Sequence, residues 1–146
     1  MILIELPPNF EQIKSAFPGA GNAGVLFAYD GNIYNPSGNR IPDALIAHES
    51  VHLKRQEKGD RYGAVISMGY GGADFWWKNY IEDSEFRYHE ELLAHVAEFR
   101  AQRDAYDRNL GARLLVSTAL RLIAPLYNYQ PPRTLQQAIK DLKREI

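Results

Sequence analysis

Cysteine is absent from the 146-residue sequence, and methionine and tryptophan occur only twice each. The absence of cysteine excludes disulfide bonds, thiolate catalysis, iron–sulfur clusters and cysteine-ligated zinc fingers. Any bound metal must therefore be held by His, Asp or Glu side chains. The four histidines are consequently the first candidate metal ligands.

An excess of charge of either sign is also lacking, because 17 Lys and Arg residues face 18 Asp and Glu residues. The resulting net charge of −1 gives the chain no general attraction to nucleic acid or to an anionic membrane. Hydrophobic residues make up 45% of the sequence and aromatic residues 12%, which is enough to bury a core. The length fits one domain, residues 1–146.

Long hydrophobic runs are missing as well. The longest apolar stretch, residues 114–126, contains Arg121 and Pro125 and is too short to span a bilayer. Residues 1–10 lack a basic segment and reach Pro7 after a short apolar run, so they do not resemble a signal peptide. We therefore expect a cytoplasmic protein with no membrane partner, or a virion-associated one if the chain is encoded by a phage.

The pattern of apolar and turn residues predicts a helix-rich α+β fold. Asp30-Gly31 suits a tight turn and predicts a β-hairpin with strands at residues 25–29 and 32–34. Helical periodicity predicts helices over residues 9–17, 43–58, 74–81, 84–108 and 111–127, followed by a last helix near the C-terminus. We expect the small sheet to lie near the N-terminal end of the fold.

Polar residues at helix starts support these assignments. Asp43 and Ser84 are the expected N-caps of their helices, and Thr134 forms the expected capping box of the last helix with Gln137.

Two further patterns have structural interpretations. The aromatic residues of segment 75–81 have helical spacing and are expected in the core. Alternating charges over residues 98–108, beginning with Glu98, predict a solvated helix face held by ion pairs.

The segment from His48 to His52 has the H-E-x-x-H pattern within a predicted helix. Residues four apart differ by about 40° around a helix, so both imidazoles can reach one ion. Glu49 lies about 100° from His48 and can address a water without being a ligand. A buried cluster of this kind would cost several kcal/mol of desolvation if left unsatisfied. The pattern predicts a Zn²⁺ site with His48 and His52 as ligands and Glu49 as general base.

A catalytic zinc ion needs a third protein ligand and one open position. Without cysteine, the candidates in the predicted helix 84–108 are Glu90, Glu91 and His95. Here the sequence resembles the Glu-zincin metallopeptidases, whose third ligand lies in an E-x-x-A or E-x-x-S pattern of a later helix. Glu91 to Ala94 matches that pattern, so the resemblance implies Glu91 as the ligand. Glu90 stays the alternative, because the match depends on one small residue.

In that family the residue after the small one often orients a ligating histidine. His95 occupies this position, where better-known members carry an acid, and we expect it to be a ligand or a hydrogen-bond partner of one. The resemblance is to small single-domain metallopeptidases of bacteria, phages and prophages, and its motif-bearing core covers about residues 24–108. It implies a zincin-like fold with the small sheet on the active-site helix and further helices within residues 111–146.

Hydrolysis of a peptide bond also needs a donor for the developing oxyanion. The candidates are His89, Tyr88, Arg87, Tyr70 and Tyr106. Tyr70 lies in a Gly-rich segment that could act as a lid, whereas His89 points away from Glu91 on a regular helix. The predicted strand at residues 25–29 offers an edge to which an extended peptide could add.

These patterns favour a zinc metallopeptidase that hydrolyses amide bonds of a peptide or protein substrate, with no nucleic-acid partner. One alternative is a catalytically silent zincin-fold binding module or a virion-associated structural module. The other is a cell-wall peptide amidase or endopeptidase delivered by a phage. Two further partners stay open: a second copy of this chain in a homo-oligomer, and a phage particle.

Overall fold

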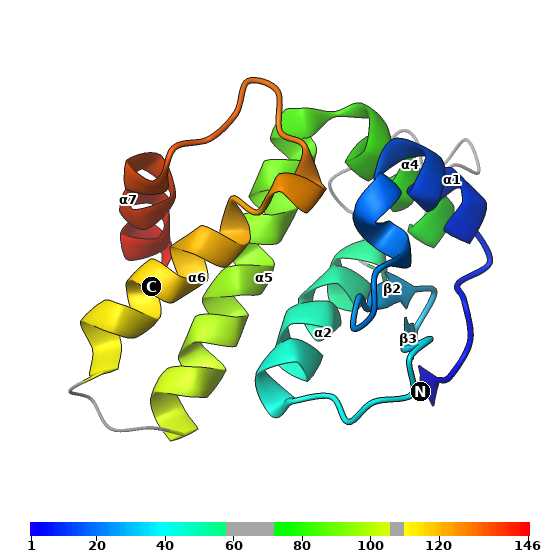
Figure 1. Cartoon of the computed structure of the whole chain (residues 1–146), viewed down its shortest axis with the longest axis horizontal. Coiled ribbons are helices and arrows are strands. Elements are labelled where there is room, and N and C mark those ends of the chain that lie inside the picture. The colour runs from blue at the N-terminus through cyan, green and yellow to red at the C-terminus, as the bar shows by residue number, and fades with distance from the viewer. Residues whose placement is uncertain (58–71, 106–109) are drawn as a thin grey trace.

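Helices dominate the computed structural model, which describes residues 1–57, 72–105 and 110–146 (Figure 1). The elements are β1 (Ile2–Leu3), α1 (Phe10–Ala16), η1 (Pro18–Gly21), β2 (Phe27–Tyr29), β3 (Asn32–Tyr34), α2 (Asp43–Glu57), α4 (Gly72–Glu82), α5 (Ser84–Ala105), α6 (Gly111–Leu122), η4 (Pro125–Tyr127) and α7 (Leu135–Glu145). The predicted helix-rich α+β class is confirmed. Within the described parts of the chain, no helix combines the length and apolar character needed to cross a membrane.

The predicted β-hairpin forms between β2 and β3. The strands pair antiparallel with Tyr29 opposite Asn32, and Asp30 and Gly31 have φ angles of 45° and 82°, as this tight turn requires. β1 adds a third strand parallel to β3, so the strand order is β1-β3-β2. The sequence does not predict β1, because a two-residue strand is too short to show a periodic pattern.

Two predicted N-caps are wrong. Asp43 is the first residue of α2, and the carbonyl of Pro42 before it accepts the first helical hydrogen bonds. At α5 the Asp83 carboxylate accepts from two backbone N–H groups of the first turn. The Ser84 hydroxyl instead accepts from the backbone N–H of Gln130. In each case the cap is one residue earlier than predicted, a difference within the usual uncertainty of helix boundaries.

The C-terminal helices differ in part from the prediction. The helix predicted over residues 111–127 ends at Leu122, and Pro125 begins the separate 3₁₀ helix η4. Proline lacks the N–H that would continue the α-helix, which explains the break. The capping box of Thr134 and Gln137 is confirmed at the start of α7, with both of its hydrogen bonds formed.

Buried apolar side chains form two clusters. The first contains the predicted core residues Trp76, Trp77 and Tyr80 of α4, together with residues of α1, η1, β2 and β3. The second joins α5, α6 and α7. Helices α2 and α5 pack side by side between the two clusters (Figure 1). The interface of α2 with α5 therefore lies in the interior, although both helices bury polar residues.

Candidate metal centre

The two motif histidines lie on the buried face of α2. His48 is 6% exposed and His52 is 4% exposed, and their ring centroids are 5.0 Å apart. One turn later Gln56 fixes α2 to the hairpin, since its amide donates to the carbonyl of Ala28 and its carbonyl accepts from the N–H of Asp30. The motif is thus held between the sheet and α5.

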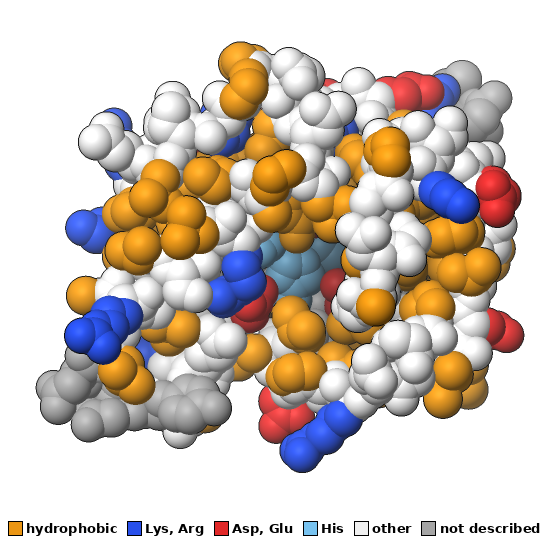
Figure 2. All heavy atoms as spheres, viewed as in Figure 1, with side chains coloured by type: hydrophobic (Ala, Val, Ile, Leu, Met, Phe, Trp, Pro, Cys, Tyr) orange, Lys and Arg blue, Asp and Glu red, His pale blue; other side chains and the backbone are white. Residues whose placement is uncertain are grey.

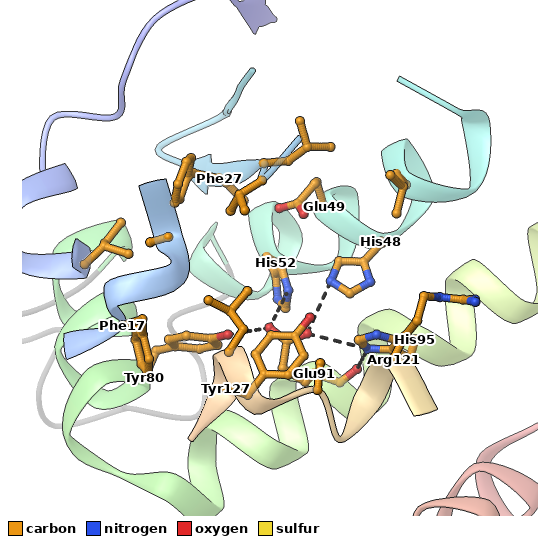
Figure 3. Close-up of a pocket in the computed structure, with 18 of the residues that line it drawn as sticks. Phe17, Phe27, His48, Glu49, His52, Tyr80, Glu91, His95, Arg121 and Tyr127 are labelled. Carbon is orange, nitrogen blue, oxygen red and sulfur yellow. Dashed lines mark hydrogen bonds and ion pairs between the residues drawn. The ribbon is translucent and has the colours of Figure 1, made fainter. Parts of the chain in front are cut away.

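Glu91 of α5 faces both motif histidines (Figure 3). Its Oε2 lies 3.3 Å from Nε2 of His48, and its Oε1 lies 3.4 Å from Nε2 of His52. The hydroxyl of Tyr80 donates to Oε1 over 2.5 Å and holds the carboxylate from the side of α4. The structure therefore brings together the three residues that the sequence and the resemblance indicate as ligands.

Glu90, the alternative ligand, faces another partner. Its carboxylate accepts from the guanidinium of Arg55, with Nη2 to Oε1 at 2.6 Å, and from the indole N–H of Trp76 at 3.0 Å. Burial raises the pKa of Glu90, but these hydrogen bonds lower it below its usual value. This carboxylate forms an ion pair with Arg55 and does not line the pocket of the motif histidines.

His95 joins the cluster from the next turn of α5. Its Nδ1 donates to the backbone carbonyl of Glu91 at 2.8 Å, and its ring centroid lies 4.6 Å from that of His48. Ligand atoms of His48, Glu91 and His95 all lie within 4.8 Å of one another, so this group could bind a metal ion. That His95 is a ligand or a hydrogen-bond partner of one stays a prediction, and its hydrogen bond here is to the main chain of Glu91.

One buried atom of the cluster supports the fit of a metal ion. Within the described parts of the chain, Oε2 of Glu91 has no hydrogen-bond partner and faces Nε2 of His48, whereas the unpaired Nδ1 of His52 lies on the ring side opposite the nitrogen that faces Glu91. Buried polar atoms are normally paired, and a carboxylate oxygen beside imidazole nitrogens would be satisfied by a bound cation. Imidazole and carboxylate groups are also the donors that zinc takes in sites without cysteine.

Burial and neighbouring charges set the protonation of the metal-free cluster. Burial lowers the pKa of His48, but the neighbouring carboxylates of Glu91 and Glu98 outweigh it and raise that pKa to about 10. Burial raises the pKa of the Glu91 carboxyl, yet His52 and His48 hold it well below its usual range. Burial and the charge of His48 lower the pKa of His95 to about 4. The cluster thus carries an ionised Glu91 beside a protonated His48.

A pocket of about 290 Å³ opens onto these residues. Figure 2 shows histidine surface at the bottom of a hollow on this face, flanked by acidic and basic side chains. The polar lining residues are His48, Glu49, His52, Glu91, His95, Glu98 and Arg121. The apolar walls come from α1, η1, residues 24–28, α4 and η4. The buried Glu49 reaches this pocket from α2, and burial raises the pKa of its carboxyl.

Most of the predicted oxyanion donors do not reach the pocket. The Arg87 guanidinium donates to the backbone carbonyls of Tyr80, Ile81, Tyr127 and Asn128. The Tyr88 hydroxyl donates to Asp141 of α7, and Nδ1 of His89 lies 3.8 Å from Oε1 of Glu90. None of these three lines the pocket. Tyr70 and Tyr106 lie outside the described residues.

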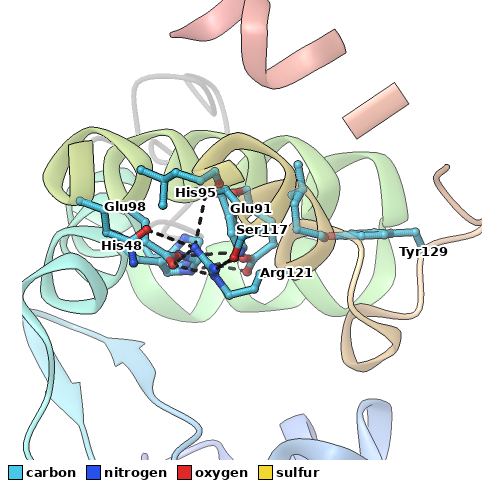
Figure 4. Close-up of polar contacts among 12 residues, drawn as sticks. His48, Glu91, His95, Glu98, Ser117, Arg121 and Tyr129 are labelled. Atoms are coloured by element: carbon cyan, nitrogen blue, oxygen red, sulfur yellow. Dashed lines mark hydrogen bonds and ion pairs between the residues drawn. The ribbon is translucent and has the colours of Figure 1, made fainter. Parts of the chain in front are cut away.

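Four polar residues of the pocket were not assigned to the site from the sequence: Tyr80, Glu98, Arg121 and Tyr127. Glu98 corrects a prediction, because it is 2% exposed instead of solvated and contacts both His48 and Arg121 (Figure 4). Its spacing was a usable signal, since positions 91, 95 and 98 follow the i, i+4, i+7 pattern of one helix face. Arg121, one of two arginines in a largely apolar helix, was a weaker signal.

Comparison with known sequence families, with curated proteins and with solved structures finds no match for this chain. Similarity to characterised proteins therefore assigns it no activity. The candidate site is defined by its own geometry: two helices that bring imidazole and carboxylate groups together at the bottom of a pocket.

Proposed function

We propose that this protein is a zinc metallopeptidase of the Glu-zincin type, with a zincin-like fold, that hydrolyses amide bonds of a peptide or protein. One observation carries the proposal. The Nε2 atoms of His48 and His52 lie 3.3 and 3.4 Å from the two oxygens of Glu91, although Glu91 comes from another helix. These three residues would hold Zn²⁺, which when bound lowers the pKa of a water and polarises a carbonyl.

Glu49 is the general base of this proposal. It lines the pocket beside the two histidines, and burial raises the pKa of its carboxyl, which favours proton uptake nearer neutral pH. Glu49 accepts a proton from the attacking water and then passes it to the leaving amine.

Tyr127 is the proposed donor to the developing oxyanion. It lines the pocket, and burial together with the charge and the hydrogen bond of Glu91 raises the pKa of its hydroxyl well above the usual range, so it keeps its proton and would exchange Glu91 for the oxyanion as acceptor.

The edge of the small sheet supports a peptide substrate. Strand order places β2 at one edge, and residues 24–28 form one wall of the pocket. The carbonyl of Ala28 already accepts from the side chains of Gln56 and Trp77. An extended peptide that adds to this edge would therefore pair with residues 24–27, next to Glu49.

A second candidate function is a zincin-fold binding or virion-associated module without activity. The position of His95 favours it, because a third imidazole lies within 4.8 Å of His48 and Glu91. As a fourth protein ligand, His95 would take the position that catalysis leaves to water. A cell-wall peptide amidase shares the chemistry of the first proposal and differs only in substrate.

Hydrolysis of a fluorogenic peptide library by the zinc-loaded protein tests the proposal. We expect hydrolysis that a chelator stops and that Glu49→Gln abolishes without loss of the metal. The matched control is Glu57→Gln, an exposed glutamate at the end of the same helix, which should retain full activity. Metal binding without hydrolysis of peptides or cell-wall peptides would favour the binding module. Restored hydrolysis in His95→Ala would then identify His95 as the ligand that fills the coordination position of the catalytic water.

A further inference from the structure

We infer that Glu98 and Arg121 are positioning residues that orient His48 for metal binding, so that α6 takes part in the metal centre. The inference rests on the proposed function for its metal and adds to it a carboxylate and a cation that the H-E-x-x-H motif does not contain. It is carried by contacts among α2, α5 and α6 (Figure 4).

The first contact orients the His48 ring. Nδ1 of His48 lies 3.2 Å from Oε2 of Glu98, and both side chains are buried. A carboxylate can only accept, so Nδ1 carries the proton of this hydrogen bond. The opposite nitrogen, Nε2, is thereby directed toward Glu91, where a metal would bind. Carboxylates that accept from a ligating histidine in this way fix its tautomer and ring orientation.

The second contact holds Glu98. Nε and Nη2 of Arg121 lie 2.9 and 2.7 Å from Oε1 of Glu98, which leaves Oε2 for His48. Arg121 is itself anchored on α6, where Nη1 donates to Ser117 at 2.7 Å. The cation also compensates the charge of a carboxylate that is buried beside Glu91. Each oxygen of Glu98 thus has its own partner, and the carboxylate plane is fixed.

Glu98 orients a ligating histidine, a role for which the family resemblance indicates residue 95. That position holds His95, whose Nδ1 donates to the backbone carbonyl of Glu91. The hydrogen bond of His48 Nδ1 does not go to this imidazole but to Oε2 of Glu98. The accepting carboxylate lies instead on the following turn of α5, within 4.0 Å of Nε2 of His95. Glu98 therefore faces both imidazoles, and Arg121 is the cation that fixes its carboxylate.

The test compares Glu98→Leu, Glu98→Gln and Arg121→Gln with Asp104→Asn, an exposed acid on the same helix. The probe is Zn²⁺, with its dissociation constant measured by competition against a chromophoric chelator. We expect Glu98→Leu to weaken binding about 10- to 100-fold, as loss of an orienting carboxylate does. Arg121→Gln should weaken it about tenfold, and Glu98→Gln should weaken it less than Glu98→Leu because an amide oxygen still accepts. Asp104→Asn should bind within about twofold of the wild type.

A second measurement does not depend on the metal. In the metal-free protein, NMR should show the Nδ1 proton of His48 as a slowly exchanging, downfield signal, which Glu98→Leu loses and Asp104→Asn retains. Wild-type Zn²⁺ affinity in Glu98→Leu, even with reduced thermal stability, would overturn the inference, as would a retained Nδ1 signal. If Glu98→Leu does not fold, Arg121→Gln decides by the same two criteria. A wild-type protein that binds no Zn²⁺ would overturn the proposed function, and the Nδ1 signal would still decide the orientation of His48.

Discussion

Oε1 of Glu91 lies 3.4 Å from Nε2 of His52, across the interface of α5 with α2. The other oxygen of this carboxylate lies 3.3 Å from Nε2 of His48, so one acid faces both imidazoles of the motif. In the metal-free protein these groups satisfy part of one another's charge. A bound cation would replace that arrangement with direct coordination.

Glu91 and Glu90 form a natural pair for testing the ligand set. Glu91→Gln should weaken Zn²⁺ binding by at least about 100-fold, because it removes the charge of a proposed direct ligand. Loss of a residue that only hydrogen-bonds to a ligand already costs about 10- to 100-fold. Glu90→Gln should leave the affinity within about threefold, because this carboxylate is bound to Arg55 and Trp76. Chelator competition measures both. The reverse order of effects would show that Glu90 is the ligand.

The ion pair of Glu90 with Arg55 should stabilise the fold. The Glu90 side chain is fully buried and that of Arg55 is 16% exposed, and removing one partner of a buried pair costs about 3–5 kcal/mol. We therefore expect Arg55→Met to lower the free energy of unfolding by about that amount in urea denaturation at pH 7. Exposed Lys54→Met on the same helix is the control and should change it little. Equal stabilities of Arg55→Met and Lys54→Met would contradict this role.

The same pair predicts an acid-sensitive stability. The fold lowers the pKa of Glu90 below its ordinary value of 4.5, so the ionised form is favoured in the native state. Its contribution is fully present above pH 4.5 and is lost as the pH falls through the lower, folded-state pKa. Denaturation series from pH 7 to pH 3 should show a shallower loss of stability in Glu90→Gln than in the wild type. Parallel curves would contradict the assignment.

Arg87 should be structural and not catalytic. Its guanidinium donates to four backbone carbonyls where α4 meets the segment after α6. Arg87→Met leaves buried carbonyls without donors, and we expect a loss of about 3 kcal/mol in the free energy of unfolding. Zn²⁺ affinity and kcat of the folded fraction should stay near wild type, because Arg87 does not line the pocket. A large fall in kcat with unchanged stability would instead support the oxyanion role.

Tyr127→Phe tests the proposed oxyanion donor. The pocket keeps its shape while one O–H donor is lost, and removal of one such donor lowers kcat by about 10²- to 10³-fold in known cases. Zn²⁺ affinity should change little. Tyr29→Phe is the control, since the Tyr29 hydroxyl donates to Asp74 and does not line the pocket. Equal kcat values for both variants would exclude Tyr127 from this role.

The parts of the fold that depend on local sequence were predictable. Asp30-Gly31 determines its turn by backbone preference alone, and the Thr134 capping box is contained within four residues. Glu98 could not be assigned in the same way. Its charge and those around it suit a solvated helix face, and it is buried because α2 and α6 both pack on α5 and bring His48 and Arg121 to it. Those contacts depend on tertiary packing, which a periodic pattern does not encode.

The pairing of Glu91 with the motif histidines lies between these cases. Spacing in α5 indicates two adjacent acids, and only the packing of α2 on α5 determines which one faces His48 and His52.

The zinc content of the purified protein tests the central claim most directly. Protein prepared without chelators, reconstituted with excess Zn²⁺ and freed of unbound ion, should contain one equivalent of zinc per chain by elemental analysis. His52→Ala and Glu91→Ala, treated in parallel, should contain well below one equivalent, because each lacks one of the proposed ligands. A wild-type protein that retains well below one equivalent, or variants that retain as much as the wild type, would contradict a metal centre formed by His48, His52 and Glu91.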